Sequence, residues 1–359
     1  MTNLIHNKLF FKDFSRLLLQ WNRKSNFRHM PWKGEKVPYK IWLSEIILQQ
    51  TRVEQGLRYY ENFITAFPNI EKLAQAPENK VFKLWEGLGY YSRCRNLIAT
   101  AKFIAHEKKG VFPSTYVDIL QLKGVGPYTA AAIASFAFNL PHAVIDGNVF
   151  RVLARVFGIK TPIDSTEGKK KFTKLANELM SKKNPGSYNQ SIMDFGATVC
   201  KPQAPLCAYC VFKKYCVAFN QNSVANFPVK EKKILHKTRH LYFFIIDYKG
   251  AVAVRERFEK DIWRHLYEFP VIETGPEVEM ASVIQEAVQQ GWLDKAGSVK
   301  ERSEIFTQKL THQTINAVFV EVAQTKKKQI SGYNWVEKSN FEKLAFPKII
   351  NDYLRKNYL

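Results

Sequence analysis

The sequence predicts two domains, a mainly helical N-terminal domain followed by a smaller α+β C-terminal domain. Apolar residues recur at helical spacing as far as Cys216, and short β-rich segments follow after residue 238. A polar, basic stretch separates the two regions. The chain of 359 residues is long enough for two domains, and a hydrophobic content of 46% allows each to bury a core.

The N-terminal part contains several helical repeats. Apolar side chains from Trp42 to Phe67 predict one helical segment that Pro68 closes. Pro127 suits the first position of a helix over residues 129–137. Further helical stretches are residues 73–105, 150–157 and 169–180. We therefore expect a helical domain over residues 1–219.

The C-terminal part has the pattern of strands. Residues 220–238 are polar and lysine-rich and are expected to form a linker. Apolar segments at 241–247 and 251–255 flank Tyr248-Lys249-Gly250, which predicts a hairpin turn. Residues 312–322 form another strand candidate, and residues 339–359 are expected to close the chain with a short helix. The predicted domain spans residues 239–359.

The charge balance favours a polyanionic partner. Lys and Arg number 54 against 32 Asp and Glu, for a formal net charge of +22. Nucleic acid fits this charge, although a basic, soluble surface is an equal alternative on charge alone. No apolar run approaches the ~20 residues needed to cross a bilayer, and the N-terminus lacks a signal-peptide pattern. An intracellular, cytoplasmic location is expected.

Four of the five cysteines crowd into one short segment. Cys200, Cys207, Cys210 and Cys216 have the spacing C-x6-C-x2-C-x5-C. Four thiolates can hold a [4Fe–4S] cluster or zinc. The spacing favours iron–sulfur, because zinc sites are expected to have two separated C-x-x-C pairs. Unrelated buried thiols are the remaining alternative, and Cys94 is expected to be an ordinary helix residue.

A glycine-containing hairpin precedes a lone aspartate. Residues 122–130 are typical of a helix, a tight turn and a second helix. The backbone at Gly124, Val125 and Gly126 is predicted to approach a DNA phosphate without reading sequence. A plain helix corner is the alternative. Asp146 precedes the next helix, and it is either a simple N-cap or a group held near a deoxyribose by the hairpin.

Together, these motifs resemble the helix-hairpin-helix DNA glycosylase superfamily and, more closely, the MutY family of adenine DNA glycosylases. The matching stretches are residues 44–51, 87–93, 122–130, 144–154 and 200–216. The resemblance implies an enzyme of base excision repair that removes adenine mispaired with 8-oxoguanine or guanine. It implies double-stranded DNA as partner, a monomer, and one [4Fe–4S] cluster.

The resemblance also assigns catalytic residues. Glu45 would protonate the adenine, and its apolar neighbours should raise its pKa; a solvent-facing glutamate is the alternative. Asp146, kept ionised by a helix N-terminus, would stabilise or attack the sugar cation, and Asn148 would orient it. Tyr128 stands where the related endonuclease III enzymes carry a catalytic lysine. Because a phenol cannot form a Schiff base, the enzyme should be monofunctional.

Further positions match family residues that contact the bases. Gln50 and Tyr90 match residues that wedge into the duplex, and Leu88 is expected to join them. The adenine pocket is matched by Arg28, Trp32, Leu48 and Gln190. For Trp32 and Leu48, core packing is an equal alternative.

The C-terminal domain resembles the MutT-like, or Nudix, domain of the family. Residues 261–270 are similar to its Trp…Phe-Pro stretch, while the Glu-rich helix with which Nudix hydrolases hold Mg²⁺ is missing. We therefore predict a recognition module without hydrolase activity. Thr311 and His312 lie where the family reads 8-oxoguanine, with Leu310 replacing an aromatic residue. A strand edge without a ligand is the alternative.

Other functions remain open. A bifunctional glycosylase/lyase acting on oxidised pyrimidines is disfavoured by Tyr128. A non-catalytic DNA-binding protein is disfavoured by the presence of both Glu45 and Asp146. Nucleotide hydrolysis is disfavoured by the missing metal-binding helix.

Overall fold

The computed structural model describes residues 2–231, 236–294 and 299–358. Residues 232–235 of the expected linker and Leu359 lie outside this range. The chain divides into two compact units: Met1–Ala74 with Ala99–Lys232, and Gln75–Ile98 with Lys233–Leu359. Among the described residues, no helix is both long and apolar enough to cross a membrane.

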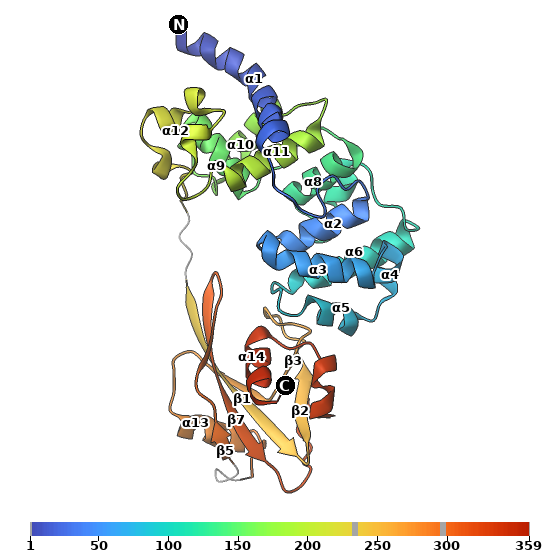
Figure 1. The fold of residues 1–359 in the computed structure, drawn as a ribbon. Coiled ribbons are helices and arrows are strands. Elements are labelled where there is room, and N and C mark those ends of the chain that lie inside the picture. Colours follow the sequence, from blue (N-terminus) through green and yellow to red (C-terminus); the bar gives the residue numbers. More distant parts are fainter. Residues whose placement is uncertain (1, 232–235, 295–298, 359) are drawn as a thin grey trace. The chain divides into compact units, whose positions relative to one another are not determined.

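The chain before the expected linker is helical (Figure 1). Its helices are α1 (Thr2–Ser25), α2 (Pro38–Leu48), α3 (Val53–Ala66), α4 (Ile70–Gln75), α5 (Glu78–Trp85), α6 (Ser92–Glu107), α7 (Tyr116–Leu120), α8 (Pro127–Phe138), α9 (Gly147–Phe157), α10 (Thr166–Leu179), α11 (Pro185–Thr198) and α12 (Val217–Asn220). Short 3-10 turns are η1 (Cys207–Tyr209), η2 (Lys213–Tyr215) and η3 (Val224–Asn226). Pro127 is at the start of α8, as the sequence predicts.

Two expected helical segments are interrupted by turns, so these predictions were wrong in their continuity. The segment from Trp42 to Phe67 breaks between α2 and α3, where Gln50 has a φ of 56°. The stretch 73–105 breaks between α5 and α6, where Tyr90 has a φ of 48°. Left-handed backbone cannot continue a right-handed helix. The stretch 73–105 also breaks between α4 and α5, where Pro77 is the N-cap of α5. Apolar spacing alone indicated none of these breaks.

The core of the first unit connects the cysteine segment to the helices that carry the site. Phe14 of α1 stacks on Phe212 at 4.4 Å between ring centroids, and Phe212 meets Phe195 of α11 edge-on at 5.2 Å. All three side chains are buried. Helices α9 and α11 also pack on each other. The cysteine segment, residues 200–216, therefore shares one core with the helices that carry Asp146 and Gln190.

The second unit is built around a mixed sheet. Its strands are β1 (Lys237–Tyr248), β2 (Ala251–Glu256), β3 (Tyr267–Glu268), β4 (Val271–Thr274), β5 (Val299–Arg302), β6 (Phe306–Lys309), β7 (Gln313–Ala323) and β8 (Asn334–Glu337). The order is β3-β2-β1-β7-β5, with β4 on β1, β6 on β7 and β8 on β2. Strands β1 and β7 are parallel, and the other pairs are antiparallel. The predicted hairpin is confirmed: Lys249 and Gly250 join β1 to β2, both with positive φ.

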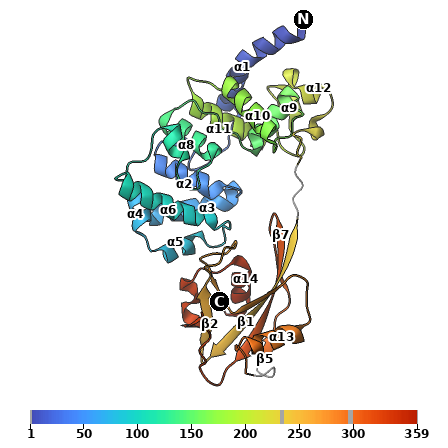
Figure 2. The same ribbon diagram turned by 180° about the vertical axis from the view of Figure 1, so that it is seen from behind.

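Helices cover both faces of this sheet (Figure 2). On one face, Phe244 belongs to a core cluster with Val283 and Ala287 of α13 (Met280–Gln289). On the other, Phe319 stacks at 3.9 Å on Tyr353 of α14 (Lys348–Asn357), which follows the 3-10 turn η5 (Lys338–Lys343). This is an α+β domain, as the sequence predicts.

Residues 75–98 also belong to the second unit. Lys83 Nζ donates to Leu344 O at 3.0 Å, and Phe346 N donates to a Glu86 carboxylate oxygen at 2.8 Å. Arg95 Nη1 donates to Arg264 O at 2.9 Å. The two units therefore differ from the expected domain limits in this segment, and residues 220–231 of the expected linker belong to the first unit.

Candidate active site

One pocket of the first unit brings together most of the predicted catalytic and base-contacting residues. Its cavity volume is about 480 Å³, within the range of pockets that bind small molecules. The predicted residues that line it are Arg28, Trp32, Glu45, Leu48, Gln50, Tyr128, Asp146, Asn148 and Gln190. They come from the segment before α2, the end of α2 and the turn after it, the first turns of α8 and α9, and α11.

Glu45 is a buried carboxyl at the edge of this pocket. Helix α2 is buried from Ile41 to Ile47, so only 7% of Glu45 is exposed. Burial raises the pKa of Glu45 to about 7, because the charged form loses its hydration. A hydrogen bond from Tyr128 lowers this pKa, and the negative charge of Asp146 raises it further. The expectation of a raised pKa is confirmed. The Tyr128 hydroxyl also donates to Met193 Sδ at 3.4 Å, so it lies between the two side chains.

Asp146 is the N-cap of α9. Its Oδ1 accepts from Val149 N at 2.8 Å, and its Oδ2 accepts from Asn148 Nδ2 at 2.7 Å. Burial raises the pKa of Asp146, whereas these hydrogen bonds and the charge of Arg151 lower it. The sequence predicts that Asp146 stays ionised because it lies at a helix N-terminus. That prediction did not include the desolvation of this carboxyl, which favours its neutral form.

A chain of hydrogen bonds runs from Asp146 to the cysteine segment. Asn148 Oδ1 accepts from Arg151 Nη2 at 2.8 Å, and Arg151 Nε donates to Cys200 O at 2.8 Å. Arg151 Nη2 also donates to Gly196 O at 2.9 Å. Arg151 was not predicted from the sequence. Its position one turn after Gly147, on the same face of α9, is the only sequence signal that could have identified it.

Asp194 was also missed, although it contacts two predicted residues. Its buried carboxylate accepts from Arg28 Nη1 at 3.0 Å and from Gln190 Nε2 at 3.1 Å. The spacing of four between Gln190 and Asp194 places them on one face of α11, which is a signal that the sequence did contain. Met193 and Gln49 line the pocket as well.

The predicted phosphate-binding hairpin has the expected shape. Gly124 has a φ of 80°, Gly126 caps α8, and Val125 N donates to Leu122 O at 3.0 Å across the turn. Gly124 is exposed, while Val125 is buried and anchors the turn. The main chain at Gly124 and Gly126 is thus free of side-chain cover.

The remaining predicted base-contacting residues lie in the second unit. Tyr90 is 38% exposed, and its hydroxyl is 3.0 Å from Thr311 Oγ1. Thr311 and His312 form the exposed tip of the β6–β7 hairpin. Leu88, expected to wedge into DNA, is only 5% exposed. A wedge role for Leu88 therefore requires this segment to open.

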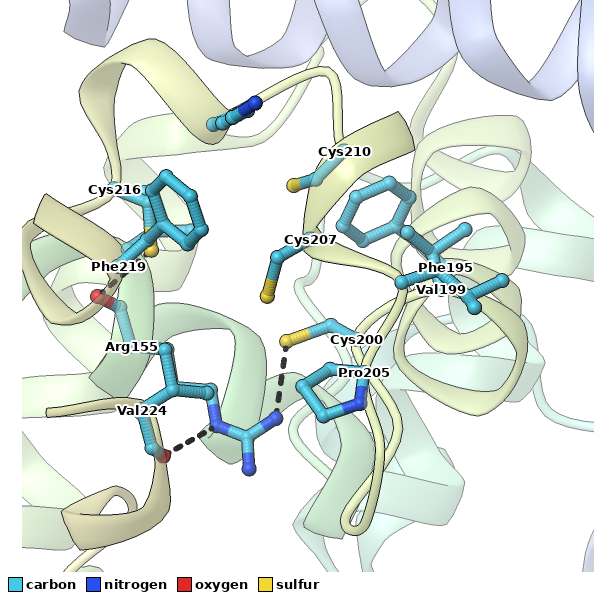
Figure 3. Close-up of a pocket in the computed structure, with 13 residues that line it drawn as sticks. Arg155, Phe195, Val199, Cys200, Pro205, Cys207, Cys210, Cys216, Phe219 and Val224 are labelled. Atoms are coloured by element: carbon cyan, nitrogen blue, oxygen red, sulfur yellow. Dashed lines mark hydrogen bonds between the residues drawn. The ribbon is translucent and has the colours of Figure 1, made fainter. Parts of the chain in front are cut away.

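The four clustered cysteines line one pocket of the first unit (Figure 3). Their thiols face a space whose other walls include Phe195, Val199 and Phe219. Arg155 Nη1 is 3.6 Å from Cys200 Sγ, and Cys216 Sγ donates to Arg155 O at 3.4 Å. Burial raises the pKa of Cys210 to about 12 and also raises that of Cys216. Cys94 lies elsewhere, buried in α6.

Among the described residues, no group of three or more His, Cys, Asp or Glu side chains converges on a point where a single metal ion could be held. In α13, where a Nudix hydrolase would hold Mg²⁺, the sequence MASVIQEAVQ contains one acidic residue, Glu286.

Two sequence profiles match the chain. Residues 43–180 match the HhH-GPD superfamily of base excision DNA repair proteins, and residues 241–356 match the NUDIX domain. The solved structure of a thermostable thymine-DNA glycosylase aligns with a TM-score of 0.56 and 28% identity, covering 60% of this chain and 99% of that one. An endonuclease III–DNA complex, at 18% identity and a TM-score of 0.51, shares the fold. Fold and site thus define a helix-hairpin-helix DNA glycosylase.

Curated relatives narrow the class further. An adenine DNA glycosylase of Buchnera aphidicola subsp. Schizaphis graminum is 37% identical over 261 residues, which is 73% of this chain and 75% of that protein. The human adenine DNA glycosylase is 41% identical over 214 residues, 57% of this chain and 39% of the human protein. The chain belongs to the adenine DNA glycosylase family, hydrolases of N-glycosyl bonds in base excision repair, and the predicted resemblance is confirmed.

Proposed function

We propose that this adenine DNA glycosylase acts on adenine paired with 8-oxoguanine or guanine, and that it hydrolyses the N-glycosidic bond without cutting the strand. The observation that carries the proposal is the pocket that Glu45, with a pKa of about 7, lines together with Tyr128 and Asp146. Double-stranded DNA containing the mispair is the proposed partner, and the enzyme acts as a monomer.

The two carboxyls are suited to different roles. With a pKa of about 7, Glu45 is about half protonated at neutral pH and can donate a proton to the departing adenine. Asp146, held by Val149 N and Asn148, can stabilise the positive charge that develops on the sugar. Such a pair of acid and carboxylate in unlike environments is what glycosidic bond cleavage requires.

The pocket favours a monofunctional enzyme. Burial raises the pKa of Tyr128 well above its ordinary value, so the residue stays a neutral phenol that cannot form a Schiff base. None of the described residues lining the pocket is a lysine. The nearby Lys33 amine forms an ion pair with Asp194 at 3.1 Å, so it is engaged outside the pocket that holds Glu45 and Asp146.

We assign recognition of 8-oxoguanine to the β6–β7 hairpin. Thr311 offers a hydroxyl donor and acceptor, His312 is exposed beside it, and Tyr90 contacts Thr311. Gln50, Leu88 and Tyr90 are the proposed wedge into the duplex. Leu310 can insert as an apolar side chain in place of an aromatic one. Residues 239–359 would then act as a recognition domain without nucleotide hydrolysis.

The cysteine pocket suits a [4Fe–4S] cluster held by Cys200, Cys207, Cys210 and Cys216. Cys200, Cys207, Cys210 and Cys216 would supply the four thiolates that such a cluster needs, one from each side chain that lines the pocket. The pocket has thiols on its walls and apolar side chains around them, as a buried cluster requires. When bound, the cluster would hold the loop that carries Lys213 and Lys214 for contact with DNA phosphates.

A strand-cleavage assay tests the proposal. Excess protein is incubated with a duplex containing one A:8-oxoguanine pair, and half of the sample is treated with alkali. A cut on the adenine strand that appears only after alkali is the expected result. A cut without alkali would support the bifunctional alternative, and a bound but uncut duplex would support a non-catalytic DNA-binding protein.

A further inference from the structure

Asp194 joins four polar side chains beneath the pocket. Its carboxylate is fully buried on α11. In addition to Arg28 and Gln190, it accepts hydrogen bonds from Lys33 Nζ at 3.1 Å and from Asn26 Nδ2 at 2.8 Å. A buried carboxylate with two cationic partners and two amide donors is strongly fixed in place.

Three of the four donors to Asp194 line pockets that also contain Glu45. Arg28 and Gln190 line the pocket that holds Glu45 and Asp146. Lys33 lines a second pocket, which shares Trp32, Glu45 and Gln190 with the first. Gln190 therefore lines both pockets together with Glu45, the proposed proton donor. Its side-chain amide nitrogen donates to Asp194.

The chemistry of Asp194 decides which way the Gln190 amide faces. A carboxylate only accepts hydrogen bonds, so the nitrogen of Gln190 must turn toward it. The Gln190 oxygen must then face away from Asp194. Arg28 likewise uses one amino group on Asp194 and keeps its other N–H groups as donors.

We infer that Asp194 is a positioning residue that makes the base pocket specific for a 6-aminopurine. With Gln190 fixed as an acceptor beside Glu45, the pocket suits a base with an amino group at position 6 and acceptor nitrogens in its ring, which is the pattern of adenine. A 6-oxo purine presents an acceptor at position 6, and it would face the Gln190 oxygen without a proton between them. The inference rests on the proposed assignment of this pocket to the flipped base.

The test compares adenine with hypoxanthine, its 6-oxo counterpart, each placed opposite 8-oxoguanine. Single-turnover rate constants are measured for wild type, Asp194→Asn and Thr198→Val. An amide at position 194 could accept from or donate to Gln190, so the Gln190 side chain could turn its NH2 group toward a 6-oxo base. The ratio of the adenine rate to the hypoxanthine rate should fall about tenfold or more in Asp194→Asn. Thr198→Val removes a bond to the main-chain oxygen of Asp194 and should keep the wild-type ratio.

Equal slowing of both substrates in a folded Asp194→Asn protein would overturn the inference, because it would indicate a structural role only. Thermal unfolding shows whether the variant folds. If Asp194→Asn does not fold, Gln190→Met is measured in its place. Loss of the amide oxygen should lower the ratio of the adenine rate to the hypoxanthine rate about tenfold. An unchanged ratio would refute the inference. If the wild-type protein leaves adenine in place, the proposed function is wrong as well. If the wild type is active and the variant keeps the wild-type ratio of adenine rate to hypoxanthine rate, only this inference is wrong.

Discussion

The pocket around Asp146 and the hairpin tip at Thr311 differ in how firmly the protein holds their polar side chains. Asp146 is held by two hydrogen bonds to its side chain and connected through Asn148 to Arg151. Thr311 is exposed and has one side-chain contact, with Tyr90. Chemistry requires charges and donors that are already in place before the substrate arrives. Recognition of a lesion can rely on groups that complete their hydrogen bonds only when DNA binds.

Loss of the Asp146 charge is expected to have the largest effect. Asp146→Asn keeps an oxygen that can accept from Val149 N, so the α9 cap and the fold should survive. Without the carboxylate, the single-turnover rate should fall by ~10³-fold or more, while DNA affinity remains near wild type. Asp13→Asn, a surface aspartate of α1, is the matched control. Near wild-type turnover in Asp146→Asn would refute the assignment.

The acidity of Glu45 should appear in the pH dependence. If the protonated form is the active one, the single-turnover rate should fall about tenfold per pH unit above pH 7. In Glu45→Gln the remaining activity should lack this fall. A rate that stays constant from pH 6 to pH 9 in wild type would exclude Glu45 as the proton donor.

The same pKa predicts a change in stability. The folded-state pKa of Glu45 lies above its ordinary 4.5, so wild type is favoured below pH 4.5 and loses this contribution as the pH rises through about 7. Relative to wild type, Glu45→Gln should therefore gain roughly 3 kcal/mol in free energy of unfolding between pH 4 and pH 8. Denaturant titrations at both pH values measure this gain. An equal difference at the two pH values would contradict the raised pKa.

The cysteine pocket should affect DNA affinity more than chemistry. Cys207→Ser should lose bound iron and visible absorbance, and DNA affinity should fall about tenfold as the loop carrying Lys213 and Lys214 loses its support. Cys94→Ala, a cysteine outside the pocket, should retain the iron. A cluster-free Cys207→Ser protein with wild-type affinity and activity would remove the structural role from the proposal.

The smallest expected effect is at the hairpin tip. Thr311→Val should lower the preference for adenine opposite 8-oxoguanine over adenine opposite guanine by about 3-fold, since one exposed hydrogen-bonding group is removed. The rate on A:G duplexes should stay within about twofold of wild type. Thr314→Val, on the β7 side of the same hairpin, is the control. An unchanged preference would remove Thr311 from lesion recognition.

By itself, the sequence determined the class of fold, most of the residues that line the pocket, and the location of the four clustered cysteines. These follow from local patterns: apolar periodicity for the helices, Pro127 and Gly126 for the hairpin, and short motifs around Glu45 and Asp146. The turn at Lys249 and Gly250 was also encoded locally, because only a few residues adopt positive φ readily.

Only the tertiary structure decided how these pieces act together. Helical spacing could not show that the chain turns at Gln50 and Tyr90. Nor could helical spacing show that Asp194 accepts a hydrogen bond from Arg28, which is 166 residues away in the sequence. The desolvation that raises the pKa of Glu45 and opposes ionisation of Asp146 also depends on packing from distant elements. Burial and long-range hydrogen bonds arise from the folded chain as a whole, so no local pattern can specify them.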